Sequence, residues 1–253
     1  MNARLQGRVC VVTGAARGIG LAIAERFGQE GARLACVDVS EKRLQPAVAE
    51  LAAKGYETRA YAVDVGAREA VRTMFARIEA DFAAPVAVLV NNAVYARFQP
   101  LPEIDEDTAL RMFAVGLHGL IWTTQAAAEQ MKRRGGGAIV NLSSVSAFHP
   151  ARDSIAYSAL KAGVVGLSRA AAAELAAEGI RVNVIAPGMI GTPASLAQFD
   201  EATLATRQAE MPLGRFGRPE EIAALAAFLA SDDASYVHGA VMLADGGWTV
   251  PAR

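Results

Sequence analysis

Seven short runs of consecutive apolar residues recur along this chain, and longer amphipathic segments lie between most of them. The runs are nearly continuous in apolar residues, which is typical of strands buried on both faces of a parallel sheet. We predict strands at 8–14, 33–39, 58–65, 86–93, 137–144, 180–187 and 240–246, and helices at 19–30, 41–54, 67–82, 107–133, 155–178 and 219–230. Such alternation predicts an α/β fold, a doubly wound sheet with right-handed crossovers.

The length favours one large domain over two small ones. The chain has 253 residues, 53% of them hydrophobic and 20% charged, which is enough for one large core. We therefore expect a single domain over residues 1–253. We expect residues 188–218, between the sixth strand and the last helix, to be irregular. A long loop in a compact domain is usually functional, so we interpret this segment as a substrate lid.

Charge and cysteine usage exclude several classes of function. The formal net charge is -1 and no basic cluster stands out, so we expect no nucleic-acid partner. No apolar run is long enough to span a membrane, and the first ten residues lack the pattern of a signal peptide. Cys10 and Cys36 lie inside apolar strands without metal-ligand spacing. We expect a reduced cytoplasmic protein without a metal site, although the sequence leaves a disulfide between these cysteines open.

The segment "TGAARGIG" (13–20) joins the first predicted strand to the first predicted helix. Gly14, Gly18 and Gly20 allow a tight turn and let a ligand approach the backbone closely. A helix start offers unpaired N–H groups and the positive end of a dipole, which suit a pyrophosphate. We interpret the segment as a dinucleotide phosphate loop, although a strand-to-helix turn needs glycine in any case.

Asp38 ends the second predicted strand, 18 residues after Gly20. This is the expected place for a carboxylate that accepts a hydrogen bond from a ribose 2′-hydroxyl. Alternatively, Asp38 only caps the next turn beside Ser40. A carboxylate here would repel a 2′-phosphate, so the sequence favours NAD over NADP. Arg17, within the loop, is the counter-argument because it could meet such a phosphate.

Tyr157 and Lys161, in "SIAYSALKAG", are four residues apart and so share one face of a helix. To act as a base near neutrality, the tyrosine needs its anion stabilised by roughly 3 to 4 kcal/mol. A lysine ammonium one turn away is one source of that stabilisation. Ser144, at the end of the fifth predicted strand, could hold the substrate oxygen. The alternative is a solvent-facing helix pair without chemistry.

The ordered motifs "TGAARGIG", "NNA", "LSSVSA", "YSALK", "RVNVIAPG" and "ADGGW" resemble the short-chain dehydrogenase/reductase family over nearly the whole chain. The resemblance implies a Rossmann fold with a seven-stranded parallel sheet and a nicotinamide cofactor. It also implies hydride transfer between a secondary alcohol and a ketone, and a homotetramer built through the helices at 107–133 and 155–178.

The resemblance also implies roles for individual residues. Tyr157 resembles the catalytic acid/base, Lys161 the residue that lowers the tyrosine pKa and holds the nicotinamide ribose, and Ser144 the hydroxyl that orients substrate. Asp64 matches the acid that contacts the adenine amino group, and Asn91 the asparagine that stabilises the sheet and borders the cofactor. The implied cofactor-binding residues are Gly14, Arg17, Gly18, Ile19, Gly20, Asp38, Asp64, Val65, Asn91, Ala93, Tyr157, Lys161, Pro187, Gly188, Ile190 and Thr192.

Two positions depart from the family pattern. Val94 stands where the family motif N-N-A-G ends in glycine, and a β-branched residue takes positive φ only at a cost. Gly116, in "VGLHG", stands where relatives usually carry a catalytic asparagine. His118 lies about 200° around the helix from Gly116 and is a poor replacement, so we expect it on a helix face. Because glycine tolerates a kinked or bulged helix, we still expect an active enzyme.

Candidate substrate contacts come from two loops and the lid. They are Tyr95, Arg97 and Phe98 after the fourth strand, Ser146, Phe148, His149 and Arg152 after the fifth, and Met189, Leu196 and Phe199 in the lid. We favour a plain turn at His149 and a solvated Arg152. Sugars, hydroxy acids and cyclic alcohols all remain open as substrates.

The main alternative function is a nicotinamide-binding protein with weak or no catalysis, which Gly116 and Val94 would support. A methyltransferase that uses S-adenosylmethionine on a similar sheet is disfavoured by the phosphate loop and by the Tyr157–Lys161 pair.

Overall fold

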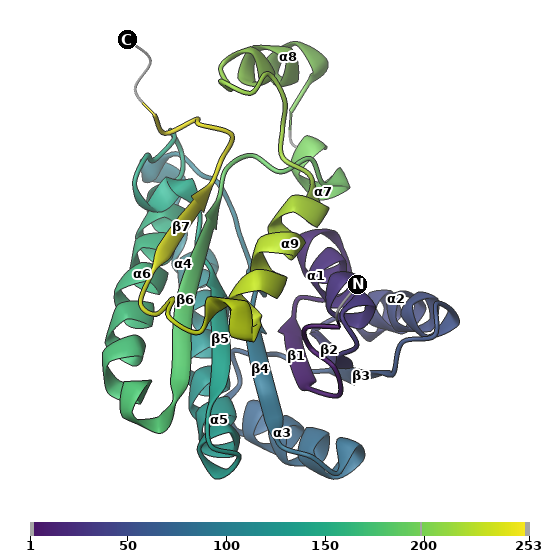
Figure 1. The fold of residues 1–253 in the computed structure, drawn as a ribbon. Helices are drawn as coiled ribbons and strands as arrows, with labels where there is room; N and C mark the ends of the chain where they lie inside the picture. Colours follow the sequence, from purple (N-terminus) through teal and green to yellow (C-terminus); the bar gives the residue numbers. More distant parts are fainter. Residues whose placement is uncertain (1–2, 198, 251–253) are drawn as a thin grey trace.

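The structure is a computed structural model that describes residues 3–197 and 199–250. Within them, seven strands form one parallel sheet in the order β3-β2-β1-β4-β5-β6-β7 (Figure 1). The strands are β1 (Val9–Thr13), β2 (Arg33–Asp38), β3 (Thr58–Ala62), β4 (Val86–Asn91), β5 (Gly137–Leu142), β6 (Ile180–Pro187) and β7 (Val241–Ala244). The chain builds outward from β1 to β3 and then crosses back to β4. The prediction of a seven-stranded parallel Rossmann sheet is confirmed.

Helices cover both faces of the sheet (Figure 1). They are α1 (Gly18–Gln29), α2 (Glu41–Ala53), α3 (Arg68–Phe82), α4 (Glu106–Phe113), α5 (Gly119–Arg133), α6 (Ile155–Leu175), α7 (Pro193–Leu196), α8 (Glu201–Ala209) and α9 (Pro219–Ala230). Side chains from α1, α2 and α9 pack on one face, and those from α3, α5 and α6 on the other. In β1, Cys10 and Val12 point to the first face, Val9 and Val11 to the second. Both sides of the strand are buried, which explains its continuous apolar sequence.

The predicted helix at 107–133 is interrupted by one turn of π-helix (η2, Ala114–His118), which separates α4 from α5 and is called the π-turn below. Single π-turns of this kind are frequent at functional sites. Two glycines of this region allow close packing. A Cβ on Gly116 would lie 2.5 Å from Leu160 Cδ1 of α6, and one on Gly119 would lie 2.9 Å from Val65 Cγ2. His118 is exposed beside Trp122, as expected for a helix-face residue.

The expectation that residues 188–218 would be irregular is wrong in part, since α7 and α8 lie within them. Side-chain caps explain both helices. Thr192 Oγ1 accepts a hydrogen bond from the Ser195 N–H at 3.1 Å, and Asp200 Oδ1 accepts one from the Thr203 N–H at 2.7 Å. Such N-caps each contribute about 1 kcal/mol to helix stability.

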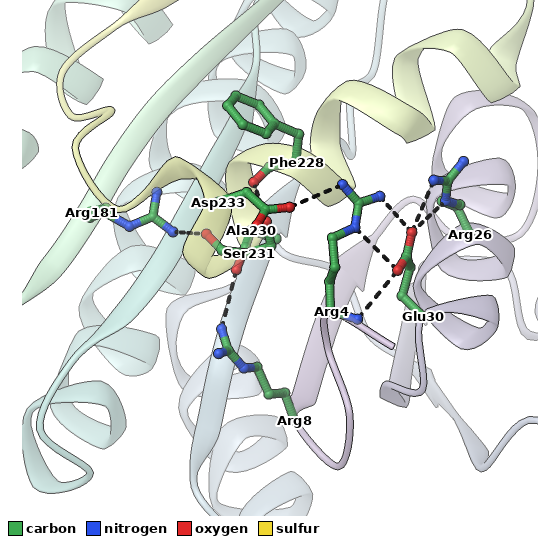
Figure 2. A network of polar contacts seen from close by, with 9 residues as sticks. All are labelled: Arg4, Arg8, Arg26, Glu30, Arg181, Phe228, Ala230, Ser231 and Asp233. Carbon is green, nitrogen blue, oxygen red and sulfur yellow. Dashed lines mark hydrogen bonds and ion pairs between the residues drawn. The ribbon is translucent and has the colours of Figure 1, made fainter. Parts of the chain in front are cut away.

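An arginine-rich network ties the N-terminal segment to the ends of α1 and α9 (Figure 2). Glu30 lies at its centre, with its carboxylate accepting from Arg4 Nη2 at 2.5 Å and from Arg26 Nε at 2.9 Å. These hydrogen bonds, above all the one from Arg4, lower the pKa of Glu30 to about 2. Arg8 and Arg181 donate to the last carbonyls of α9, which lack helical partners. The network lies at the edge of the sheet where the strands begin, because Arg8 directly precedes β1 and Arg181 is the second residue of β6.

Candidate active site

The phosphate loop is shaped by residues without side chains. Gly14 and Gly18 adopt φ of 66° and 57°, and a Cβ on Gly20 would overlap the Gly14 carbonyl oxygen. Arg17, the N-cap residue of α1, makes no capping hydrogen bond through its side chain. Because this side chain does not cap the helix, it supplies no acceptor to the first N–H groups of α1. These N–H groups could donate to a pyrophosphate, so the loop fits such a group.

Asn92 and Thr13 hold this loop in place through hydrogen bonds at the end of β1, and sequence reasoning missed both roles. Asn92 Nδ2 donates to the carbonyls of Thr13 at 2.9 Å and Gly14 at 3.2 Å. The backbone N–H groups of Asn92 and Ala93 donate to Thr13 Oγ1. The signal was present in the paired asparagines that end the fourth strand. The side-chain amide of Asn91 binds within the sheet, and that of Asn92 binds the phosphate loop.

Asn91 fastens β4 to its neighbours, as expected. Its Nδ2 donates to Asn141 Oδ1 of β5 at 2.9 Å, and its Oδ1 accepts from Thr123 Oγ1 of α5 at 2.7 Å. Asn91 and Asn141 are buried, so these partners are needed to satisfy their amides.

Asp38 ends β2 and Asp64 follows β3, at the same edge of the sheet as the phosphate loop. Asp38 Oδ1 accepts from the Ser40 N–H at 2.9 Å, so the alternative role as a turn cap is observed, and Arg43 Nη2 lies 3.6 Å away. Asp64 accepts from the Gly66 N–H and from Arg111 Nη1 of α4. Burial works against ionisation of Asp64, but these hydrogen bonds outweigh it and leave the pKa below its usual range. No motif in the sequence indicated the contact between Asp64 and Arg111.

Tyr157 and Lys161 lie on α6, and Ser144 follows β5. Lys161 Nζ lies 5.7 Å from the centroid of the Tyr157 ring and donates to the Leu142 carbonyl at 2.8 Å. Ser143 Oγ donates to the Lys161 carbonyl and so joins α6 to the end of β5. Lys161 is only 5% exposed, which rules out the alternative of a solvent-facing pair.

Burial dominates the electrostatics of this pair. It lowers the pKa of Lys161 to about 8. It also raises the pKa of Tyr157 above its usual range, while a hydrogen bond with Ser144 acts in the opposite direction. Beside Lys161 is a small cavity of about 10 Å³, lined also by Thr13, Asn91 and Gly116. This is about the volume needed to hold one water molecule.

The structure brings only some of the predicted substrate residues to Tyr157. The Phe98 ring lies 5.1 Å from the Tyr157 ring, and the Ser146 N–H donates to Ser144 Oγ at 3.1 Å. Tyr95 packs against the core instead, with Arg97 Nε directed at its hydroxyl at 3.4 Å.

The other candidates lie further out. His149 is exposed and contacts Trp248 of the C-terminal segment, with ring centroids 6.4 Å apart. Met189 lines a cleft of about 730 Å³ between the segment after β6 and the segment after β7. Phe148 and Arg152 are exposed, while Leu196 is half-buried and the Phe199 ring contacts Arg207.

Val94 needs no left-handed backbone. Among the described residues other than glycine, only Ala83 and Asp153 have positive φ. Val94 is 42% exposed at the start of the loop that carries Phe98. The loop therefore accommodates a β-branched residue without strain.

Within residues 3–197 and 199–250, no helix is long and apolar enough to cross a membrane, and no three His, Cys, Asp or Glu side chains lie together as a group that could hold a metal ion. Cys10 and Cys36 are free and buried, and burial raises the pKa of both thiols. These thiols are therefore poor nucleophiles and poor metal ligands.

Known proteins resemble this chain over its whole length. A family model described as enoyl-(acyl carrier protein) reductase matches residues 14–249. Galactitol 2-dehydrogenase (L-tagatose-forming) of Cereibacter sphaeroides is 44% identical over 98% of this chain and 97% of its own. Cis-4-hydroxycyclohexanecarboxylate dehydrogenase of Sinomonas cyclohexanicum is 41% identical over 96% of each chain. A crystal structure of gluconate 5-dehydrogenase from Burkholderia cenocepacia J2315, in complex with NADP and tartrate, aligns with a TM-score of 0.93 at 31% identity, covering 99% of this chain and 98% of that one.

Proposed function

Because the chain belongs to the short-chain dehydrogenase/reductase family, we propose that it is an NAD-dependent dehydrogenase that interconverts a secondary alcohol and a ketone. The observation that carries the proposal is the buried Lys161 ammonium beside the Tyr157 ring, with Ser144 near enough to that tyrosine to lower its pKa. A lysine this deeply buried has no role in solubility, and its charge is costly to keep without a function.

In the proposed mechanism, Tyr157 is the acid/base at the reacting oxygen. For oxidation the Tyr157 phenolate oxygen takes the proton from the substrate hydroxyl and becomes the neutral hydroxyl, and for reduction that hydroxyl donates its proton to the substrate oxygen. Ser144 Oγ holds the same substrate oxygen. Lys161 Nζ stabilises the tyrosine anion through its charge, which opposes the effect of burial on the tyrosine pKa. A bound nicotinamide supplies the hydride acceptor or donor for the carbon.

The site fits a dinucleotide through the glycines of the phosphate loop, which leave the α1 N-terminus accessible to an anion. We propose the following cofactor-binding residues: Gly14, Arg17, Gly18, Ile19, Gly20, Asp38, Asp64, Val65, Asn91, Ala93, Tyr157, Lys161, Pro187, Gly188, Ile190 and Thr192. NAD is preferred in this proposal because Asp38, 11% exposed in its side chain, would face a 2′-phosphate with like charge. The NADP complex of the gluconate 5-dehydrogenase makes direct comparison of the two cofactors essential.

For the substrate we propose a polyol, following the galactitol dehydrogenase. Hydroxyls of Ser144 and Ser146 lie together beside Tyr157, and the Phe98 ring forms an apolar wall. Phe98 and Ser146 are the substrate-side residues that the geometry favours over Tyr95, His149 and Met189. We further propose a cytoplasmic homotetramer, with residues 188–218 as the lid.

The test is an absorbance screen at 340 nm with NAD and with NADP against galactitol, threitol, gluconate and cis-4-hydroxycyclohexanecarboxylate. We expect turnover with a polyol and a higher kcat/KM with NAD. Tyr157→Phe is the matched control, because it removes one oxygen and should abolish turnover while leaving NADH binding. A protein that binds NADH but turns over none of these compounds would instead support the alternative of a cofactor-binding protein.

A further inference from the structure

Asp64 is held by a side chain from a distant part of the sequence. Its Oδ2 accepts a hydrogen bond from Arg111 Nη1 at 2.7 Å, and its Oδ1 accepts one from the Gly66 N–H at 2.9 Å. Arg111 belongs to the last turn of α4, and Asp64 follows β3. Both side chains are partly exposed, at 39% and 36%, so a ligand can still reach the carboxylate.

The place of this ion pair in the fold suggests what it serves. The strands run β3-β2-β1, with the phosphate loop after β1 and Asp38 as the last residue of β2. Ligands of open α/β sheets bind at this carboxyl edge. A dinucleotide with its pyrophosphate over the β1 loop and a ribose at Asp38 would therefore direct its adenine toward Asp64.

The turn that carries Asp64 is packed closely on the helices around the π-turn. A Cβ on Gly66 would lie 3.2 Å from the Ala114 carbonyl oxygen, and one on Gly119 would lie 2.9 Å from Val65 Cγ2. Arg111 adds the ion pair to this interface. The backbone of the turn is thus fixed by packing, while the Gly66 N–H holds one oxygen of the carboxylate and Arg111 holds the other.

An ionised carboxylate has about four positions for accepting hydrogen bonds, and Asp64 uses two of them within the protein. The remaining positions suit the exocyclic amino group of adenine, which is a donor. We propose that Arg111 is a positioning residue for the cofactor, because it orients the Asp64 carboxylate toward the adenine. This inference rests on the proposed function.

The experiment compares binding of NADH with binding of reduced nicotinamide mononucleotide, which lacks the adenine half. For Arg111→Gln we expect the Kd for NADH to rise about fivefold, the usual scale of a partly exposed ion pair. The Kd for the mononucleotide should stay unchanged. Arg111→Lys should recover part of the loss, since it restores the charge without the planar fork. In an Asp64→Asn background, Arg111→Gln should have little further effect.

Arg72→Gln is the matched control, because Arg72 lies on α3 with its side chain 82% exposed and its only described ion pair is with Glu69 at 3.9 Å. Thermal unfolding of every variant checks that it is folded. Equal losses for NADH and for the mononucleotide would reduce Arg111 to a general structural role and overturn the inference, as would unchanged binding of NADH. If the wild-type protein binds NADH but turns over no alcohol, only the proposed function is refuted. The role of Arg111 would still be tested by comparing the binding of NADH with that of the mononucleotide.

Discussion

The substitution Gly116→Ala tests how the π-turn is packed against α6, the helix that carries Tyr157 and Lys161. A Cβ at this position would lie 2.5 Å from Leu160 Cδ1 and 2.9 Å from Leu160 Cδ2. Leu160 is fully buried and precedes Lys161, so its side chain can shift only by displacing the residues packed around it. The same contact shows that Gly116→Asn would not restore an asparagine side chain to free space, because Leu160 already occupies that space.

The size of the effect follows from two opposing contributions. Forcing an extra methyl group into a packed core costs about 1 to 3 kcal/mol. Alanine in place of glycine returns up to about 1 kcal/mol through helix propensity. We therefore expect Gly116→Ala to lower the free energy of unfolding by about 1 to 2 kcal/mol. In a Leu160→Ala background the clash is absent, so the same substitution should be neutral or stabilising by up to about 1 kcal/mol.

Urea unfolding of the four proteins of this cycle, at one fixed protein concentration, measures the coupling. Gly166→Ala on α6 is the control, since no heavy atom of the described residues lies within 4 Å of a Cβ there, apart from the local helix backbone. Its effect should be neutral or favourable. We also expect kcat of Gly116→Ala to fall at least about tenfold through displacement of Lys161, and to recover in the double variant. Additive effects within about 0.5 kcal/mol would refute the steric argument.

Three further predictions concern charged groups. Lys161→Met should inactivate the enzyme yet raise the unfolding free energy of the cofactor-free protein by about 2 kcal/mol at pH 7, because burial lowers the lysine pKa to about 8. This gain in stability should shrink as pH rises from 8 toward 10.5, where the unfolded chain also loses the lysine proton. A gain that does not change with pH would contradict the assignment to the buried charge. Glu30→Gln should lower the unfolding free energy by about 2 kcal/mol at pH 7, and since the wild-type contribution is lost as pH falls below 4.5 toward the folded-state pKa of about 2, the two proteins should converge in acid urea titrations. Asp38→Asn should improve kcat/KM with NADP relative to NAD by about tenfold, the effect of removing one like-charge contact, and an unchanged ratio would count against Asp38 as the ribose acceptor.

The sheet was predictable because both faces of its strands are buried. All seven strands lie within the predicted ranges, and the helices begin and end within three residues of their predicted bounds, except where the π-turn intervenes. At that turn Gly116 packs against Leu160 and Gly119 against Val65, and these are tertiary contacts that no local sequence pattern indicates. The helices α7 and α8 could have been found, because Thr192 and Asp200 are residues typical of N-caps.

The candidate site was predictable where one motif carries several functional side chains. Ser144, Tyr157 and Lys161 come from two adjacent motifs, and the structure brings them together. Arg111 was missed because its partner Asp64 lies 47 residues away in the sequence. Substrate contacts from loops were predicted least well. The positions of Tyr95, His149 and Met189 depend on how each loop folds back on the protein, which residue type alone does not determine.

The contact between Gly116 and Leu160 restricts the order in which this protein can evolve. A larger residue at position 116 is tolerated only after position 160 has become smaller, whereas the reduction at 160 alone leaves a cavity beside Lys161. We expect each single step to lower stability, and only the two together to fill the core again. Gly116 is thus held in place by a neighbour rather than by its own chemistry. Directed evolution that screens one substitution at a time would be expected to leave it unchanged.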